Sequence, residues 1–208
     1  MYTTLSLIRH GHTDGNGRPG ARLSGRTDVP LSHRGREEVR CLQSRLAGSQ
    51  AFAAIYSSPL SRAHDTASSL AEAGLGPVQL CRGLQEIDCG SLEGMPLSEV
   101  RLRYPELWEA NLRQTDEDFR WPGGESYREF RSRCLRTVRA LVRSHPGARV
   151  SLVTHAGLVS QVLGYLAGLS PACWGPFQPG NAGITVLRWS HGTARVLTFD
   201  DRAHLPPD

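Results

Sequence analysis

Short apolar runs alternate with amphipathic segments along the chain. The apolar runs have the length of buried strands, which they predict at residues 5–8, 51–56, 78–81, 150–153, 183–189 and 194–199. Segments whose apolar residues recur every three or four positions predict helices at residues 32–47, 59–74, 125–146 and 157–167. Strands that alternate with helices in this way form parallel sheets with helices on both faces. The predicted fold class is therefore α/β, a three-layer αβα sandwich with a mostly parallel central sheet.

Two of the predicted helices carry clear end signals. Ser32 has the side chain of an N-cap at the start of the first helix. The helix that begins near Glu125 ends at Pro146, because proline cannot continue it. Apolar residues form a stripe along one side of this second helix, namely Phe130, Cys134, Val138, Leu141 and Val142. A stripe of this kind marks the buried face of a helix.

The middle of the chain, residues 83–124, lacks this regularity. Glycine and proline residues break it into short helical pieces, at Gly90, Gly94, Pro96, Pro105, Pro122 and Gly123. We interpret this segment as a small inserted cap or lid on a single domain that spans residues 1–208. The chain after Asp201 is expected to be frayed.

Charge and cysteine usage exclude several classes of partner. The net charge is +4, but the 24 cationic residues are offset by 20 carboxylates spread along the chain, and no basic run is interleaved with aromatic residues, so nucleic acid is not expected as a partner. Every cation is an arginine, which excludes lysine Schiff-base chemistry and supplies forked donors suited to phosphate. The five scattered cysteines indicate reduced thiols and a cytoplasmic protein. No apolar stretch approaches the roughly 20 residues that cross a bilayer, so no membrane association is expected.

Two histidines follow predicted strands directly. His10 comes after the strand at residues 5–8, and His155 comes after the strand at residues 150–153. Ligands of such sheets bind at the carboxyl ends of the strands. A glycine-rich loop, Gly15 to Gly25, follows His10 and can bring backbone amides close to an anion. These positions predict a site for an anionic ligand.

Five sequence blocks carry a specific resemblance. They are Leu7 to Thr13 with Asn16, Leu23 to Gly25 with Asp28 to Gly35, Ser57 to Ala67, Leu84 to Gly94, and Val153 to Gly157. In this order they resemble the histidine phosphatase superfamily, which contains cofactor-dependent phosphoglycerate mutases and many small phosphatases. The blocks cover most of the chain. Two departures are that His12 stands where Glu or Gln is usual and Ala156 where Gly is common, and these bear on specificity more than on mechanism.

The resemblance implies a role for each matching residue. His10 would be the nucleophile that is transiently phosphorylated, and Glu86 would give a proton to the leaving group. His155, if cationic, would stabilise charge on the transferring oxygens. Donors to the phosphoryl group would come from the side chains of Arg9, Arg62 and Asn16, from the substrate loop at Ser24 and Gly25, and from the amide at Ala156. No metal and no other cofactor is expected.

Elementary electrostatics agree with these roles. A phosphomonoester repels nucleophiles because its oxygens are anionic, so a site must neutralise charge before attack. Two arginines beside His10 disfavour the imidazolium, which keeps a lone pair available, provided that the other ring nitrogen is held by an acceptor. A nearby anionic phosphate raises the pKa of Glu86 toward the working pH.

Three alternatives stay open beside a phosphatase of small phosphomonoesters. A phosphoglycerate-type phosphomutase uses the same first half-reaction, although mutases of this family generally carry longer insertions than this chain. The spacing of His10, His12 and Asp14 resembles half of a binuclear metallohydrolase motif, but Gly15 stands where a further histidine is expected. A non-catalytic binder of a phosphorylated metabolite would use the arginines without needing Glu86.

The sequence leaves the substrate open beyond a small phosphorylated metabolite. We expect the cap, with Trp108, Arg120 and Trp121, to contact the part of the substrate that is not phosphate. Exposed sheet edges and the apolar region around Trp174 and Phe177 are compatible with a homodimer.

Overall fold

The computed structural model describes residues 2–15, 21–190 and 192–206, and its centre is a six-stranded sheet. The strands are β1 (Thr3–Arg9), β2 (Ala54–Ser57), β3 (Val78–Leu80), β4 (Arg149–Thr154), β5 (Ile184–Ser190) and β6 (Thr193–Asp201). Their order across the sheet is β3-β2-β4-β1-β5-β6. The first four are mutually parallel, while β5 runs antiparallel to β1 and β6 antiparallel to β5. The mostly parallel sheet predicted from the sequence is confirmed.

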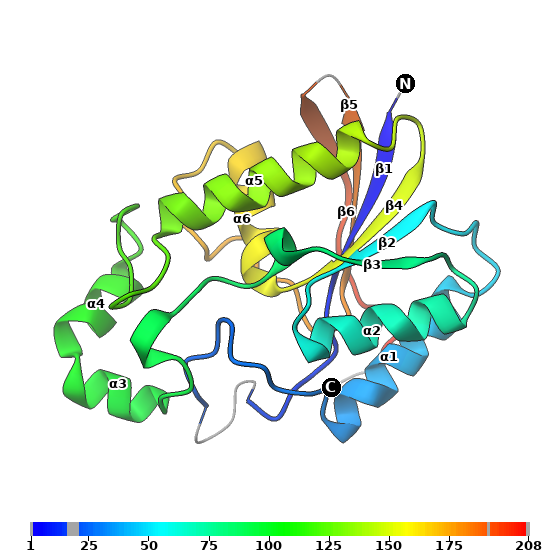
Figure 1. Ribbon diagram of the computed structural model, residues 1–208. Coiled ribbons are helices and arrows are strands. Elements are labelled where there is room, and N and C mark those ends of the chain that lie inside the picture. The colour runs from blue at the N-terminus through cyan, green and yellow to red at the C-terminus, as the bar shows by residue number, and fades with distance from the viewer. Residues whose placement is uncertain (1, 16–20, 191, 207–208) are drawn as a thin grey trace.

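Helices cover both faces of this sheet (Figure 1). They are α1 (His33–Leu46), α2 (Ser61–Glu72), α3 (Leu97–Arg103), α4 (Pro105–Arg113), α5 (Tyr127–Arg143) and α6 (Ala156–Leu166). Helices α1 and α2 lie on one side of the sheet, and α5 and α6 lie on the other. The three-layer αβα sandwich is therefore confirmed. Within the described residues, no helix combines the length and apolar character needed to cross a membrane.

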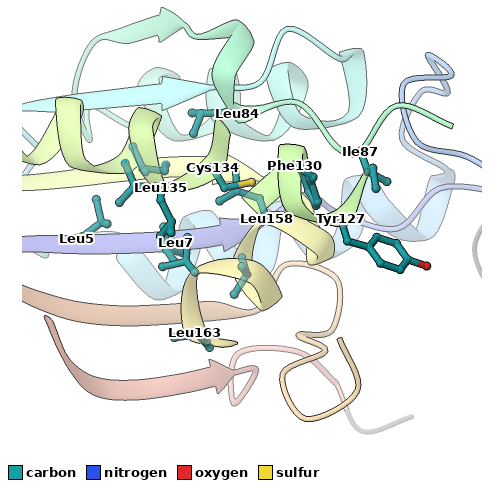
Figure 2. Packing of buried hydrophobic residues seen from close by; sticks show 14 of the residues in the cluster. Leu5, Leu7, Leu84, Ile87, Tyr127, Phe130, Cys134, Leu135, Leu158 and Leu163 are labelled. Atoms are coloured by element: carbon teal, nitrogen blue, oxygen red, sulfur yellow. The ribbon is translucent and has the colours of Figure 1, made fainter. Parts of the chain in front are cut away.

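Burial on both faces explains why strand β1 is mostly apolar between Leu5 and Ile8. Leu5 and Leu7 belong to the core under α5 and α6, whereas Ile8 belongs to the core under α1 and α2. Figure 2 shows Leu5 and Leu7 beside Cys134 and Leu158 from these helices. A central parallel strand is buried on both faces, so apolar residues occupy the successive positions Leu7 and Ile8, and even the polar Ser6 is buried.

Helix α5 begins and packs as its sequence predicts. Ser126 and Glu129 form a reciprocal capping box, in which each side chain bonds the backbone N–H of the other residue. Four residues of the predicted stripe are buried and Leu141 packs against the core at its edge. The helix ends at Arg143, shortly before Pro146.

Residues 82–124 contain short elements only. Two single 3₁₀ turns, Arg82–Leu84 and Gly90–Leu92, precede α3 and α4, and both helices lie to one side of the layered core in Figure 1. At the other end of the chain the structure differs from the sequence prediction. Residues 202–206 form a turn closed by a bond from the Leu205 N–H to the Arg202 carbonyl, and Leu205 packs against the core under α1 and α2. This apolar contact explains why the segment is ordered where fraying was expected.

A buried arginine ties α5 to α6 and to the turn that follows α6. Arg131 donates from Nε to Gln161 Oε1 at 2.6 Å, and its two terminal nitrogens donate to the carbonyls of Leu169 and Ser170. Burial lowers the pKa of this guanidinium group. Because the acceptors are themselves partly buried, removal of the donor leaves several polar groups unsatisfied.

We therefore expect Arg131→Met to lower the free energy of unfolding by about 2–4 kcal/mol, since it removes three bonds to a charged donor at once. Arg136→Met is the matched control, because Arg136 is an exposed residue of the same helix. Urea denaturation of both variants measures the difference. Equal midpoints for the two variants would contradict this account of the α5–α6 contact.

Candidate active site

The adjacent strands β1 and β4 bring the two predicted histidines together. His10 follows β1 and donates its backbone N–H to the Thr154 carbonyl of β4 at 3.0 Å. The imidazole centroids of His10 and His155 lie 5.1 Å apart. Both rings are buried. The carboxyl ends of the two strands thus hold the two rings in one place.

A cavity of about 80 Å³ opens beside these rings. It is lined by Arg9, His10, Thr13, Ser24, Val29, Arg62, Glu86, His155 and Ala156. Seven of these were expected from the sequence, namely Arg9, His10, Ser24, Arg62, Glu86, His155 and Ala156. Asn16 lies outside the described residues. The small volume suits a phosphate-sized group and is below the range of pockets that enclose whole metabolites.

The ring of His10 is held in one tautomer. Its Nδ1 lies 2.7 Å from the Gly11 carbonyl, which can only accept, so Nδ1 carries the proton. The lone pair is consequently on Nε2, which accepts from Arg62 Nε at 3.2 Å. Burial lowers the pKa of His10 well below 6.5, and Arg9 and Arg62 lower it further. His10 is therefore neutral at physiological pH and presents its lone pair toward the arginines.

Arg62 is fixed by the loop that precedes α1. Its two terminal nitrogens donate to the carbonyls of Thr27 and Gly25, both at 2.8 Å. The same loop caps α2, because Asp28 Oδ1 accepts from the Ser61 N–H at 2.7 Å. Burial lowers the pKa of Arg62, but a guanidinium group stays charged at neutral pH.

Arg9 supplies the second guanidinium group. One terminal nitrogen donates to the Pro179 carbonyl at 2.8 Å. Its Nε is buried and has no hydrogen-bond partner among the described residues. A buried charged donor without a partner is costly, so this nitrogen is available for an anionic ligand.

Glu93 organises the loop that holds Arg62. Its carboxylate accepts from the backbone N–H groups of Gly25, Arg26, Thr27 and Cys89, and from the Thr27 hydroxyl. The Gly25 amide, expected from the sequence to bind substrate, is thus engaged by Glu93, and Gly25 instead holds Arg62 through its carbonyl. Sequence reasoning missed Glu93, although it stands in the quoted block from Leu84 to Gly94.

Glu86 faces the pocket from the residues after β3. Its two oxygens accept from the Ile87 and Gly157 N–H groups, both at 2.9 Å. Burial raises its pKa, and these two bonds and Arg62 oppose the rise. Gly157 must be glycine for this approach, because a Cβ there would lie 2.2 Å from Glu86 Oε1.

His155 is neutral in the ligand-free protein. Burial lowers its pKa well below 6.5, followed by the influence of His10 and the arginines, so a cationic His155 requires a bound anion. Its Nε2 lies 2.9 Å from Ser58 Oγ, and its Nδ1 is buried without a partner in the described part of the chain. Ser58 Oγ already accepts from the Leu60 N–H at 3.3 Å. When the Ser58 hydroxyl donates its proton to Nε2, Nδ1 carries the ring proton and is a free donor.

His12 has a structural role. Its backbone N–H donates to Glu38 Oε2 at 2.7 Å and its Nδ1 lies 2.8 Å from Ser32 Oγ at the start of α1. Across residues 2–15, 21–190 and 192–206, no group of three His, Cys, Asp or Glu side chains is arranged to hold a metal ion.

Taken together, these groups can neutralise an anionic phosphoryl group with two arginines, attack it with a neutral imidazole and exchange a proton through Glu86. Binding alone needs neither the tautomer of His10 nor the raised pKa of Glu86.

Comparison with known proteins agrees with this geometry. The chain is 31% identical over 205 residues to a metal-independent phosphoserine phosphatase of Arabidopsis thaliana, covering 98% of this chain and 83% of the relative. It is 36% identical over 179 residues to the glucosyl-3-phosphoglycerate phosphatase of Mycolicibacterium vanbaalenii, covering 82% and 76%.

Solved structures show the same fold. YhfR of Bacillus stearothermophilus superimposes with a TM-score of 0.89 at 30% identity, over 97% of this chain and 98% of that one. The phosphoserine phosphatase of Entamoeba histolytica, in complex with 3-phosphoglyceric acid, gives 0.84 at 30% identity, over 98% and 100%. The model of the histidine phosphatase superfamily (branch 1) matches residues 5–202. The chain therefore belongs to the histidine phosphatase superfamily, branch 1.

Proposed function

We propose that this protein is a phosphatase that hydrolyses a small phosphomonoester through a phosphohistidine intermediate on His10. The observation that carries the proposal is the state of the His10 ring, whose Nδ1 is held by the Gly11 carbonyl while Nε2 faces Arg62. The relatives named above are themselves phosphatases, which supports hydrolysis. The family fold and the cavity at the strand ends fit the same reaction.

In the first step a phosphoryl group occupies the cavity between the two arginines. The Arg62 Nε–H and the unpartnered Arg9 Nε–H meet anionic oxygens, and the His155 Nδ1–H provides a neutral donor. The Nε2 lone pair of His10 forms the new bond to phosphorus as the phosphorus–oxygen bond of the ester breaks. Glu86, whose protonated form burial favours, gives its proton to the departing oxygen.

In the second step a water molecule takes the place of the released alcohol. Glu86, now a carboxylate, removes a proton from this water as its oxygen bonds to phosphorus. The phosphorus–nitrogen bond breaks, and its electron pair returns to Nε2. Inorganic phosphate leaves, and Glu86 and His10 are both restored to their starting protonation states.

The same features bear on the substrate and on the location of the enzyme in the cell. The substrate is a small phosphorylated metabolite, because the phosphate cavity is narrow and adjoins a second small cavity. A cytoplasmic location is supported by the five cysteines, all of which are free thiols.

We expect a phosphorylated substrate to label the protein once, with phosphate that is labile in acid and stable in base. His10→Ala removes the only nitrogen nucleophile of the proposed reaction, so the label and the release of phosphate are both lost. His33→Ala, which removes an exposed histidine of α1, is the control and keeps both. Intact-mass measurement after a rapid quench detects the label. A label that persists in the His10→Ala variant would refute the nucleophile.

We expect Glu86→Gln to lower kcat for an alkyl phosphate by about 10²- to 10⁴-fold, because the amide cannot transfer a proton. With p-nitrophenyl phosphate the loss is much smaller in the first step, since that leaving group departs without a proton. In the native enzyme the activity toward the alkyl phosphate falls as pH rises through the raised pKa of Glu86, and this alkaline limb is absent in the variant. Pre-steady-state rates against pH measure both effects. An equal loss on the two substrates argues against Glu86 as the acid.

A further inference from the structure

A second cavity, of about 210 Å³, adjoins the phosphate cavity. Ser24 and Glu86 line both cavities. The second one is otherwise lined by Leu23, Ile87, Cys89, Asn111, Gln114, Trp121, Tyr127 and Trp174. Because Glu86 stands at the boundary, the part of a substrate that departs from phosphorus enters this second cavity; this inference rests on the proposed function.

Asn111 lines the second cavity and has one end of its amide group engaged. Tyr127 donates its hydroxyl proton to Asn111 Oδ1 at 2.7 Å. Burial raises the pKa of the Tyr127 phenol, so the phenol keeps its proton and acts as the donor. Figure 2 shows the Tyr127 hydroxyl pointing away from Leu7 and Leu158. The amide oxygen of Asn111 is thus occupied, and its NH₂ group makes no hydrogen bond within the described chain.

The amide oxygen of Gln114 is also engaged in a hydrogen bond. Its Oε1 accepts from the backbone N–H of Trp174 at 3.1 Å. The oxygen end of this amide is thereby fixed against the loop that carries Trp174, and its NH₂ end has no partner in the described part of the molecule. Gln114, like Asn111, offers the cavity a donor.

Trp174 contributes a third donor. Its ring is stacked on Phe130 with centroids 5.5 Å apart and meets Tyr127 edge-on at 5.3 Å. The indole Nε1 is buried and lacks a hydrogen-bond partner among the described residues. The aromatic contacts hold the ring in place, so this N–H keeps a hydrogen bond to offer that the described residues do not take up.

The proton that Glu86 must donate also bears on which leaving group reacts. Among its described lining residues only Glu86 bears an ionisable carboxylate, and none bears a cation. An ammonium group beside Glu86 would favour the carboxylate and deplete the proton that Glu86 must donate, whereas a further anion favours the protonated acid. Trp108 does not line the cavity, and Arg120, also expected to contact substrate, pairs with Glu129 at 3.3 Å.

We propose that the second cavity selects leaving groups whose polar ends are hydrogen-bond acceptors, a carboxylate being the best fit, and discriminates against an ammonium group. Asn111, Gln114 and Trp174 are the specificity-determining residues. The phosphate cavity binds the phosphoryl group that all phosphomonoesters share. These three side chains contact the leaving group and distinguish one substrate from another.

Two compounds test the proposal directly. 3-Phosphoglycerate and O-phosphoserine share a carbon skeleton, a phosphate and a carboxylate, and differ in bearing a hydroxyl or an ammonium group on the same carbon. In the His10→Ala variant, which cannot turn them over, calorimetry measures the two dissociation constants. We expect 3-phosphoglycerate to bind at least about tenfold more tightly, because the ammonium group loses its hydration while it faces the donor groups of Asn111, Gln114 and Trp174.

Charge variants assign the selectivity to the cavity. Gln114→Glu in the same background replaces the donor by a carboxylate and is expected to shift the ratio of the two constants toward O-phosphoserine by at least about tenfold. Gln79→Glu is the same chemical change at an exposed position of β3 and leaves the ratio unaltered. Equal or reversed binding of the two compounds, failure to bind either, or an equal response to the two variants would overturn the proposal.

The catalytic proposal is tested separately. Labelling of the native protein on His10 establishes the reaction whatever the ratio of the two constants is. Loss of selectivity with labelling intact refutes only the assignment of the second cavity. Selective binding by a native protein that is never labelled refutes the catalytic step and leaves a selective binding site.

Discussion

The site is organised by a guanidinium group that is buried beside an imidazole. A buried charge is tolerated only where its hydrogen-bonding capacity is met, and Arg62 meets it with two backbone carbonyls and the Nε2 atom of His10. Burial is the main reason that the His10 ring stays unprotonated, and the charges of Arg9 and Arg62 lower its pKa further. The same positive charge of Arg62 attracts an anionic phosphoryl group into the cavity. The contact between Arg62 and His10 thus prepares both the nucleophile and the binding site. The loop from Gly25 to Asp28 holds Arg62 in this position.

Much of this could be predicted from sequence because it depends on local pattern. The strands before His10 and His155 are short and mostly apolar, with one serine in each, and parallel neighbours place their carboxyl ends at one edge. The capping signal at Ser32 and the stripe from Phe130 to Val142 are equally local, and the structure bears them out. Residues that follow strands directly are therefore accessible to sequence reasoning.

What escaped prediction depends on backbone orientation in irregular segments. Glu93 accepts hydrogen bonds because backbone N–H groups from two loops, far apart in sequence, point toward its carboxylate. The periodicity of apolar residues does not predict the direction of these N–H groups. The same reason explains why Gly25 was assigned to substrate when its amide bonds Glu93. Trp174 lies in a loop without regular pattern, and its contacts with Phe130 and Tyr127 arise only when α5 and that loop pack together. Its ring is partly buried against these two side chains.

The single carboxylate of Glu93 has a consequence for how such enzymes diversify. It accepts hydrogen bonds from the loop that positions Arg62. It also accepts from the Cys89 N–H, in the turn that precedes α3. A lineage that exchanged residues 97–124 for a different insertion would keep its chemistry if the exchange began after this anchor. A graft that began earlier would disconnect the arginine. Backbone bonds also join Met95 and Leu97 to the loop from Ala21 to Leu23, so a boundary for exchanging the cap and engineering new selectivity falls at Leu97.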